Sequence, residues 1–378
     1  MLAFTVMDIS CFPPFHDHHT HVSFYSALSG TADLSACSTE REAIEILRNV
    51  SGSGNIIFAR GWKNNLYDIS KHELEQLPPV AICNISLHSF KINKRAREIF
   101  YQTDENVIKH IDSQEWVEHN LNAVFALFTD YGNLELIPTF VSSLEKQGIY
   151  EMEDMSVSSE KSALFLAKEY ADRIMLWAEM SMYEKFSEAR KFVHGIKLFA
   201  DGALGARTAA LEHACAGGNI KFLLHDKPEM RKLLKLAAEC KPAIAVHAIG
   251  DAAIEQSLDC VEDVFHNEKK VSIRIEHAQM ISISQAMRAK KMGIILSMQP
   301  NFSDDSLCYA DRLSEYYINA NNPFRMLIDE AGFIPGKDLL FGSDGMPHGM
   351  LPAAISSVKS PLLSQRLSVD ELIAGYKC

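Results

Sequence analysis

The second half of this 378-residue chain repeats a unit of about 30 residues, in which a short apolar run precedes an amphipathic segment. AIAVHAIG at 243–250 is a β-rich run, and 251–265 then carries apolar side chains at helical spacing. Such alternation predicts a parallel α/β sheet, because parallel neighbours need a long crossover connection. Further strands are predicted at 271–277, 294–300 and 338–345, with a helix from Ser282 to Gly293.

The first half of the chain is less regular. Strands are predicted at 148–155, 173–182 and 193–202. Residues 103–147 are mostly helical in pattern and too long for one crossover, so they form either a lid over a barrel or a plain surface insertion. At this length the chain forms one large domain, or one large and one small. Large α/β domains are usually barrels or doubly wound sheets, and we expect a (β/α)8 TIM barrel.

Composition excludes several classes of function. The net charge is −12, and the only dense basic run is KINKRAR at 91–97, so no nucleic-acid partner is expected. No apolar run approaches the ~18 residues of a membrane span, and the N-terminus lacks the features of a signal peptide. The eight cysteines include no C-x-x-C pair, which is typical of reduced thiols and predicts a cytoplasmic protein.

Polar side chains interrupt the predicted strands near their carboxyl ends. This rim is where parallel α/β folds gather ligands and catalytic groups, and a buried strand would otherwise continue apolar. The chain therefore predicts one shared site. The side chains concerned are His19, His21, Lys197, His247, His277 and Asp344.

The histidines of PPFHDHHTH at 13–21 allow more than one interpretation. Residues i and i+2 of a strand point to the same side, so His19 and His21 can share one metal ion. His16 and His18 have the same spacing, and position alone does not choose between the pairs. A lone H-x-H is more often a pair of ordinary surface or core histidines.

The remaining candidates each have a functional and a structural interpretation. His247 and His277 suit zinc and related ions, or are satisfied histidines at strand ends. Asp344 can bind metal and accept a proton, or it caps a turn. Lys197 lies in an apolar strand, where a desolvated amine becomes nucleophilic and can form a carbamate with carbon dioxide. Its structural alternative is a salt bridge to Asp201.

Together these motifs resemble the amidohydrolase superfamily, and in particular its N-substituted formamide deformylase-like (YtcJ-like) branch. The resemblance covers about residues 12–362. It rests on KLFADGALGARTAAL at 197–211, VHAIGDAAI at 246–254, RIEHAQ at 274–279, SMQPNF at 297–302 and FGSDGMP at 341–347, with weaker matches at 58–68 and 87–93.

The resemblance implies a role for each position. His19 and His21 would hold one divalent metal, His247 and His277 a second, and a carbamate on Lys197 would bridge them. Asp344 would touch the first metal and shuttle the proton. The residues that the resemblance places near the substrate, or in support of the site, are His88, Asn93, Asp201 and Arg207.

The chain departs from the family in two respects. Members carry a small β-sandwich built from both ends, but only 18 residues precede His19 and 34 follow Asp344. We therefore expect the sandwich to be largely absent, with a remnant strand at 1–14 and the barrel at 15–378. His16 and His18 stand where the family has apolar and small residues, and they would add stray metal affinity.

The resemblance implies a hydrolase that cleaves a C–N bond of an amide, formamide or cyclic amide. Two metals, expected to be zinc, would activate a hydroxide that attacks a small-molecule substrate. One alternative is a mononuclear hydrolase or deaminase of the same fold. Another is an inactive barrel with a binding or regulatory role. Loss of the sandwich would also leave an apolar face for a homo-oligomer.

Overall fold

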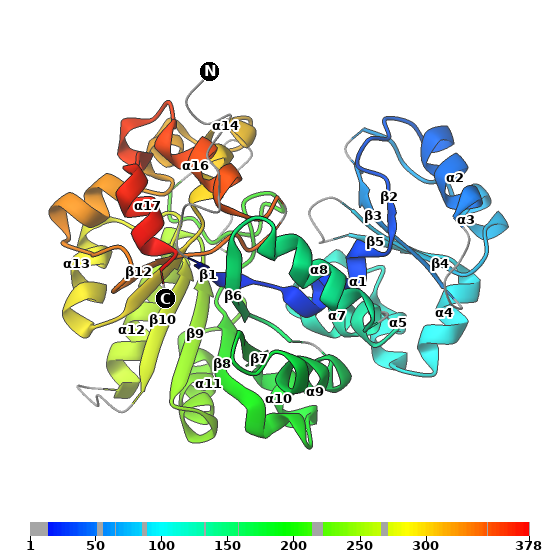
Figure 1. The fold of residues 1–378 in the computed structure, drawn as a ribbon, viewed down its shortest axis with the longest axis horizontal. Coiled ribbons are helices and arrows are strands. Elements are labelled where there is room, and N and C mark those ends of the chain that lie inside the picture. Colours follow the sequence, from blue (N-terminus) through cyan, green and yellow to red (C-terminus); the bar gives the residue numbers. More distant parts are fainter. Residues whose placement is uncertain are drawn as a thin grey trace. The chain divides into compact units, whose positions relative to one another are not determined.

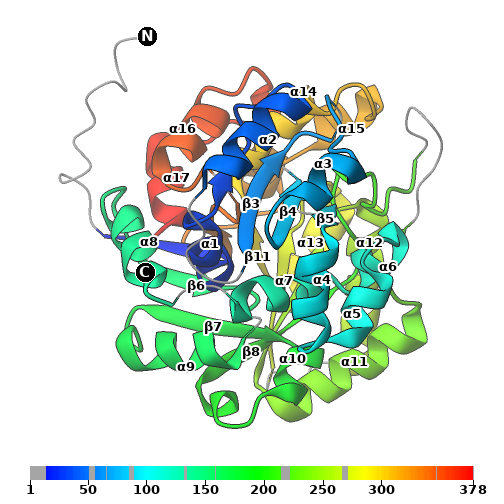
Figure 2. The same cartoon turned by 90° about the vertical axis from the view of Figure 1, so that its right-hand side faces the viewer.

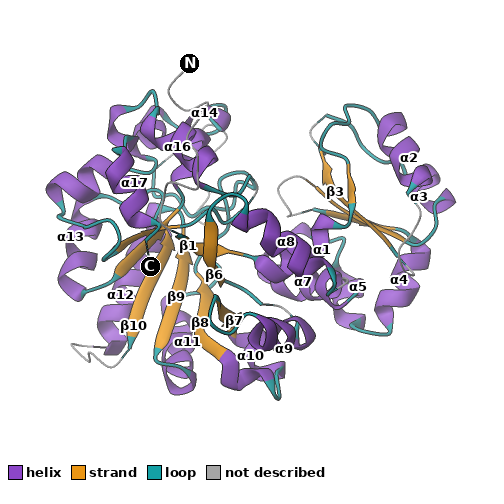
Figure 3. Cartoon of the chain, viewed as in Figure 1, coloured by secondary structure: helices purple, strands orange, loops and turns teal. Residues whose placement is uncertain are grey.

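The computed structural model describes residues 14–377 except 51–55, 65, 85–88, 132–133, 158, 214–221, 266–270 and 346. The chain divides into two compact units, of which the larger comprises residues 1–21, 142–157 and 166–378. The smaller comprises 22–141 and 158–165. Figure 1 colours them along the sequence, and Figure 3 separates their helices from their strands.

The larger unit is an eight-stranded parallel sheet nearly closed into a barrel, in the order β1-β6-β7-β8-β9-β10-β11-β12. A parallel bridge between Thr20 and Asp344 joins its first and last strands. The (β/α)8 barrel predicted from the sequence is thereby confirmed. The strands are β1 Phe15–Thr20, β6 Ile149–Asp154, β7 Ile174–Glu179, β8 Val193–Phe199, β9 Ala243–Ala248, β10 Ser272–His277, β11 Ile295–Met298 and β12 Leu339–Phe341.

Helices between the strands bury their apolar faces against this sheet. In α12, Ile254 and Leu258 lie in the same core cluster as Ile244 and Val246 of β9. The predicted limits of the next helix also hold, since Ser282 forms a capping box and Gly293 ends the helix at a φ of +72°. The helices of this unit are α10 Met180–Lys185, α11 Lys227–Cys240, α12 Asp251–Phe265, α13 Ile283–Met292, α14 Asp305–Cys308, α15 Glu315–Ala320, α16 Met350–Val358 and α17 Val369–Gly375.

The smaller unit has a sheet of its own, in the order β2-β3-β4-β5 (Figure 2). Its first three strands are parallel and β5 is antiparallel to β4. The strands are β2 Ala32–Asp33, β3 Ile57–Trp62, β4 Val80–Asn84 and β5 Phe90–Ile92. The helices are α1 Val22–Ser29, α2 Glu40–Asn49, α3 Lys71–Gln76, α4 Lys94–Tyr101, α5 Glu105–His110, α6 Gln114–His119 and α7 Leu121–Asp130, while α8 Leu136–Glu145 and α9 Glu160–Glu169 each contribute to both units.

This division differs from the expected one, a barrel over 15–378 with a helical insertion at 103–147. The insertion between β1 and β6 starts directly after His21 and contains a sheet, because β3 and β4 pair with each other and not with barrel strands. The segment 103–147 is helical, as predicted. Residues 1–13, which hold most of the predicted remnant strand, lie outside the described residues.

Every strand of the described residues belongs to one of the two sheets, and the small β-sandwich is not found among them. Across the same residues, no helix combines the length and the apolar character needed to cross a membrane.

Candidate metal centre

Three of the predicted metal ligands converge where the barrel closes. The ligand atoms of His19, His277 and Asp344 all lie within 4.8 Å of one another. Nε2 of His21 lies 3.0 Å from Oδ1 of Asp344, and Nε2 of His19 lies 3.6 Å from the same oxygen. The ring of His247 is 4.5 Å from that of His277, centroid to centroid. The carboxyl ends of β1, β9, β10 and β12 thus bring four histidines and one carboxylate together.

Three of these imidazoles are held at one nitrogen and open at the other. Nδ1 of His19 bonds Oε2 of Glu276 at 2.6 Å, and Nδ1 of His277 bonds Oε1 of Gln299 at 2.7 Å. Nε2 of His247 bonds the carbonyl oxygen of Gly202 at 3.0 Å. All three partners are oxygen acceptors, so the bonded nitrogen carries the proton. Nε2 of His19, Nε2 of His277 and Nδ1 of His247 are left with lone pairs, as metal ligands require.

The pKa values of the same groups favour the protonation states that bind a cation. Burial, and then the Lys197 charge, lowers the pKa of His19 to about 4, and burial lowers that of His277 to about 3. Both rings are therefore neutral at physiological pH. Burial opposes ionisation of Asp344, but the interaction with His19 and the hydrogen bond from His21 outweigh it and hold its pKa well below the ordinary value. Neutral imidazoles around an ionised carboxylate fit a divalent metal of the zinc type.

Backbone strain is concentrated at two of these residues. His277 has a φ of +70° and Asp344 a φ of +56°, although neither is glycine. The backbone N–H of Asp344 donates to the carbonyl oxygen of His19 at 2.6 Å, which holds Asp344 against β1. Left-handed conformations of non-glycine residues are costly and persist where the surroundings fix them, often at functional sites.

Lys197 of β8 is only 1% exposed, and its ammonium group forms no hydrogen bond or ion pair with a described residue. Its nitrogen lies 5.4 Å from the ring centroid of Phe199. Burial lowers its pKa to about 8, although Glu276 and Asp344 oppose this effect. The alternative salt bridge to Asp201 is not formed.

Asp201 instead supports the loops around the centre. Its carboxylate accepts the backbone N–H groups of Ala210, Ile249 and Gly250 at 2.8–3.0 Å. It also lies 3.5 Å from Nε2 of His247. These contacts indicate that Asp201 fixes the loops that follow β8 and β9.

The structure describes the contacts of two further residues that were expected near the substrate. Arg207 is 47% exposed in its side chain and lies 3.6 Å from Asp311. Asn93 is fully buried in the smaller unit, where it caps α4 and donates to the carbonyl oxygens of Leu74, Leu77 and Pro78. Its amide therefore serves the framework of that unit. His88 lies outside the described residues.

A buried charge network behind the centre was not predicted. Arg274 bonds Oε1 of Glu276 through Nε at 2.7 Å and both oxygens of Glu153 through Nη1 at 2.9 and 2.7 Å. Its Nη2 also donates to the carbonyl oxygen of His18. The signal was present in the sequence, since VSIRIEH places Arg274 and Glu276 on one face of a buried strand, where charges need partners.

The barrel and the donors at its carboxyl rim define a hydrolase scaffold with a metal centre. The Amidohydrolase family model matches residues 10–351, and the chain belongs to this family, as the sequence motifs predicted. This membership implies a hydrolase that uses a divalent metal.

Two relatives illustrate the similarity. The Bacillus subtilis (strain 168) protein YtcJ, named as an amidohydrolase, is 26% identical over 84% of this chain and 68% of its own length. Protein LONG AFTER FAR-RED 3 of Arabidopsis thaliana is 30% identical over 36% of this chain and 25% of its length.

Two solved structures share the fold, each titled an uncharacterized metal-dependent hydrolase. The Pyrococcus furiosus protein has a TM-score of 0.73 at 22% identity and covers 96% of this chain and 80% of its own. The Pyrococcus horikoshii protein has a TM-score of 0.76 at 20% identity and covers 96% of this chain and 79% of its own.

Proposed function

We propose that this protein hydrolyses a C–N bond in a small amide, formamide or cyclic amide. The observation that carries the proposal is the convergence of His19, His277 and Asp344, whose ligand atoms lie within 4.8 Å of one another. In both histidines a buried oxygen acceptor fixes the nitrogen opposite the metal side. This arrangement goes beyond what a structural histidine needs.

The proposed metals are two divalent ions, preferably zinc. His19, His21 and Asp344 would hold the first ion, His247 and His277 the second, and a carbamate on Lys197 would bridge them. When bound, such ions polarise a carbonyl group and make hydroxide available at neutral pH.

Asp344 is the residue best placed to move the proton. Its side chain is 21% exposed, whereas that of His19 is 1% exposed, so substrate and water reach the carboxylate. The ionised form accepts a proton from the attacking water and delivers it to the leaving nitrogen.

Lys197 is suited to carbamate formation because its amine is buried without a partner acid. With a pKa of about 8, about a quarter of the amine is uncharged at pH 7.5 and able to attack carbon dioxide. The new N–C bond forms as the nitrogen loses a proton, which leaves an anionic carbamate.

A mononuclear hydrolase or deaminase is the second candidate. It is favoured by one observation, namely that the compact donor group found among the described residues consists of His19, His277 and Asp344. In that case a single ion occupies the three-residue group and Lys197 stays an amine.

The test is a substrate panel of small amides, formamides, cyclic amides and amino-substituted rings, with zinc-loaded protein. We expect hydrolysis of at least one C–N class, and a loss of at least hundredfold in kcat for Asp344→Asn. Asp311→Asn, at an exposed acid, is the matched control and should keep full activity. Release of ammonia only from amino-substituted rings would favour the deaminase. Equal activity of both variants would refute the role of Asp344.

A further inference from the structure

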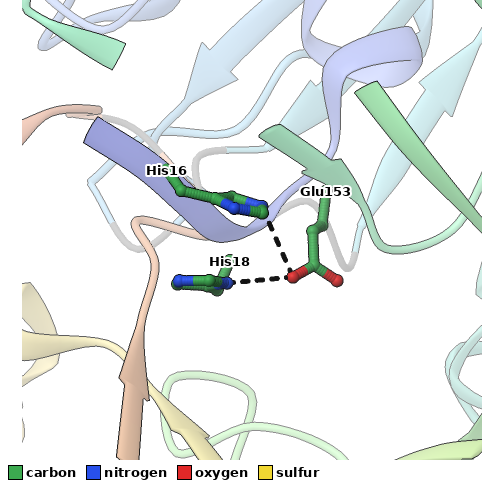
Figure 4. A group of neighbouring side chains, drawn as sticks. All are labelled: His16, His18 and Glu153. Atoms are coloured by element: carbon green, nitrogen blue, oxygen red, sulfur yellow. Dashed lines mark hydrogen bonds and ion pairs between the residues drawn. The ribbon is translucent and has the colours of Figure 1, made fainter. Parts of the chain in front are cut away.

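We propose that His16, His18 and Glu153 form an additional site for a divalent cation of the zinc class, here called the inner site. Figure 4 shows the two imidazole rings facing one carboxylate oxygen of Glu153. His16 and His18 come from β1 and Glu153 from β6, the strand that pairs with it. None of the three belongs to the candidate metal centre.

The distances suit a shared ion. Nδ1 of His18 lies 3.0 Å from Oε1 of Glu153, and Nε2 of His16 lies 3.6 Å from the same oxygen. The three ligand atoms all lie within 4.8 Å of one another. Tetrahedral zinc, with bonds near ~2.1 Å, separates its ligand atoms by about 3.4 Å. The two measured distances lie on either side of that value.

The two rings are arranged to reach one ion together. They stack with centroids 3.9 Å apart and planes inclined by 22°. The side chains of His16 and His18 are only 12% and 8% exposed, and that of Glu153 is 3% exposed. The inner site is therefore largely shielded from water, which strengthens binding of a cation by an anionic ligand.

The hydrogen bonding of His16 is incomplete in the way that a metal ligand requires. Nε2 of His16 is buried and has no hydrogen-bond partner among the described residues. Buried polar atoms without a partner are rare and call for an explanation such as an ion. His18 is held from behind, because its Nε2 lies 3.1 Å from the carbonyl oxygen of Lys377. A carbonyl can only accept, so this nitrogen carries a proton, and Nδ1 would exchange its 3.0 Å hydrogen bond to Oε1 of Glu153 for a bond to the ion.

Nδ1 of His16 has a similar partner, since it lies 3.5 Å from Oε2 of Glu151. Both imidazoles of the inner site thus have an oxygen behind the nitrogen opposite the metal side. This is the pattern of His19 and His277 in the candidate metal centre, and oxygen partners of this kind orient histidine ligands and raise their basicity.

The local charge also admits a cation. Arg274 is the guanidinium that contacts Glu153, and it contacts Glu276 equally closely, at 2.7 Å. The charge of Lys197 also acts on these two buried carboxylates, and Glu151 adds a third carboxylate beside His16. A divalent ion at the inner site would offset part of the negative charge of the three carboxylates. Each oxygen of Glu153 has two lone pairs, so Oε1 can bind the ion while it accepts from Arg274.

The test is zinc stoichiometry on the full chain after treatment with a chelator. Zinc chloride is added in excess, weakly held ions are removed on a desalting column, and zinc is counted by plasma mass spectrometry. The wild type is compared with His16→Leu and with His110→Leu, a matched control at an exposed histidine whose ring bonds the carbonyl oxygen of Asn106 and stacks on Trp116. Circular dichroism checks that each variant is folded.

We expect His16→Leu to bind about one zinc ion fewer per chain than the wild type, and His110→Leu to bind as many as the wild type. Equal zinc in all three proteins would overturn the proposal. A second measurement needs no variant, namely anomalous diffraction at the zinc edge from wild-type crystals. A peak bounded by His16, His18 and Glu153 supports the inner site, and its absence at millimolar zinc refutes it, even if His16→Leu does not fold.

Discussion

Replacing Glu153 by Gln removes the central charge of the buried network and is expected to cost substantial stability. The side chain accepts from Arg274 Nη1 at 2.7 and 2.9 Å, from His18 Nδ1 at 3.0 Å and from Trp177 Nε1 at 2.7 Å. Burial alone would raise the pKa of Glu153, but the Arg274 and His18 charges and the His18 hydrogen bond lower it to about 2.

The magnitude follows from that pKa. The gap between about 2 and the ordinary 4.5 corresponds to about 3 kcal/mol. Breaking a buried ion pair at one partner costs a similar ~3–5 kcal/mol. Because the native pKa is depressed, this stabilisation is complete above pH 4.5 and is lost as the pH falls toward 2. At pH 4 about 2.5 kcal/mol of it should remain.

The assay is urea unfolding of chelator-treated protein at pH 7.5 and pH 4, followed by tryptophan fluorescence. Trp177 is the only tryptophan of the barrel unit, and it bonds Glu153 directly. The matched control is Glu151→Gln on the same strand, whose side chain is 42% exposed and which should cost below about 0.5 kcal/mol. A cost for Glu153→Gln of under about 1 kcal/mol, or one equal to the control, would refute the argument.

Three further predictions concern the candidate metal centre. Glu276→Gln should weaken zinc binding by about 10- to 100-fold in calorimetry, because Glu276 orients His19, and an unchanged affinity would count against that role. Gly342→Ala places a Cβ against the backbone nitrogen of His19, so both the melting temperature and the zinc affinity should fall, and normal values of both would contradict the close approach. Burial holds the pKa of His277 at about 3, so near pH 6 this imidazole takes up a proton only in the unfolded chain. The free energy of unfolding therefore decreases as the pH is lowered. Between pH 7.5 and 5.5, urea unfolding of zinc-free wild type should therefore lose about 1.4 kcal/mol relative to His277→Gln, and a constant difference would disprove the depressed pKa.

The barrel could be predicted because its strands carry a strong local signal. A parallel strand with helices over its outer face is buried on both sides, and it reads as an uninterrupted apolar run such as AIAV at 243–246. The predicted strands over 271–277 and 338–345 contain β10 and β12 for the same reason. Polar residues at the ends of such runs then stand out, which is how His247, His277 and Asp344 could be selected.

The smaller unit could not be predicted in the same way. Its strand β2 has two residues and β5 has three, too few for any period to show. Their place in the sheet depends on pairing with β3 and β4, which is a property of tertiary structure. The helices over 103–147 were visible because their apolar spacing is local.

Which of the first histidines faces which site also depends on tertiary contacts. Strict alternation along a strand would put His16 and His18 on one face and His19 on the other. The register of β1 shifts between Asp17 and Thr20, and the neighbours His18 and His19 bond Glu153 and Glu276, which are joined through Arg274. Spacing alone cannot reveal such a shift, so the sequence left the ligand pair open. The ligand roles of His19 and His21 stay a prediction.

The central claim is that hydrolysis depends on metal held by His19, His277 and Asp344. The most direct measurement follows hydrolysis of the best substrate of the panel while zinc is added to chelator-treated protein, with bound zinc counted in each sample. We predict almost no activity without metal, a rise to a plateau as zinc binds, and no recovery by His277→Gln at the same zinc concentration. Full activity in protein shown to contain no metal, or full recovery by His277→Gln, would contradict the claim.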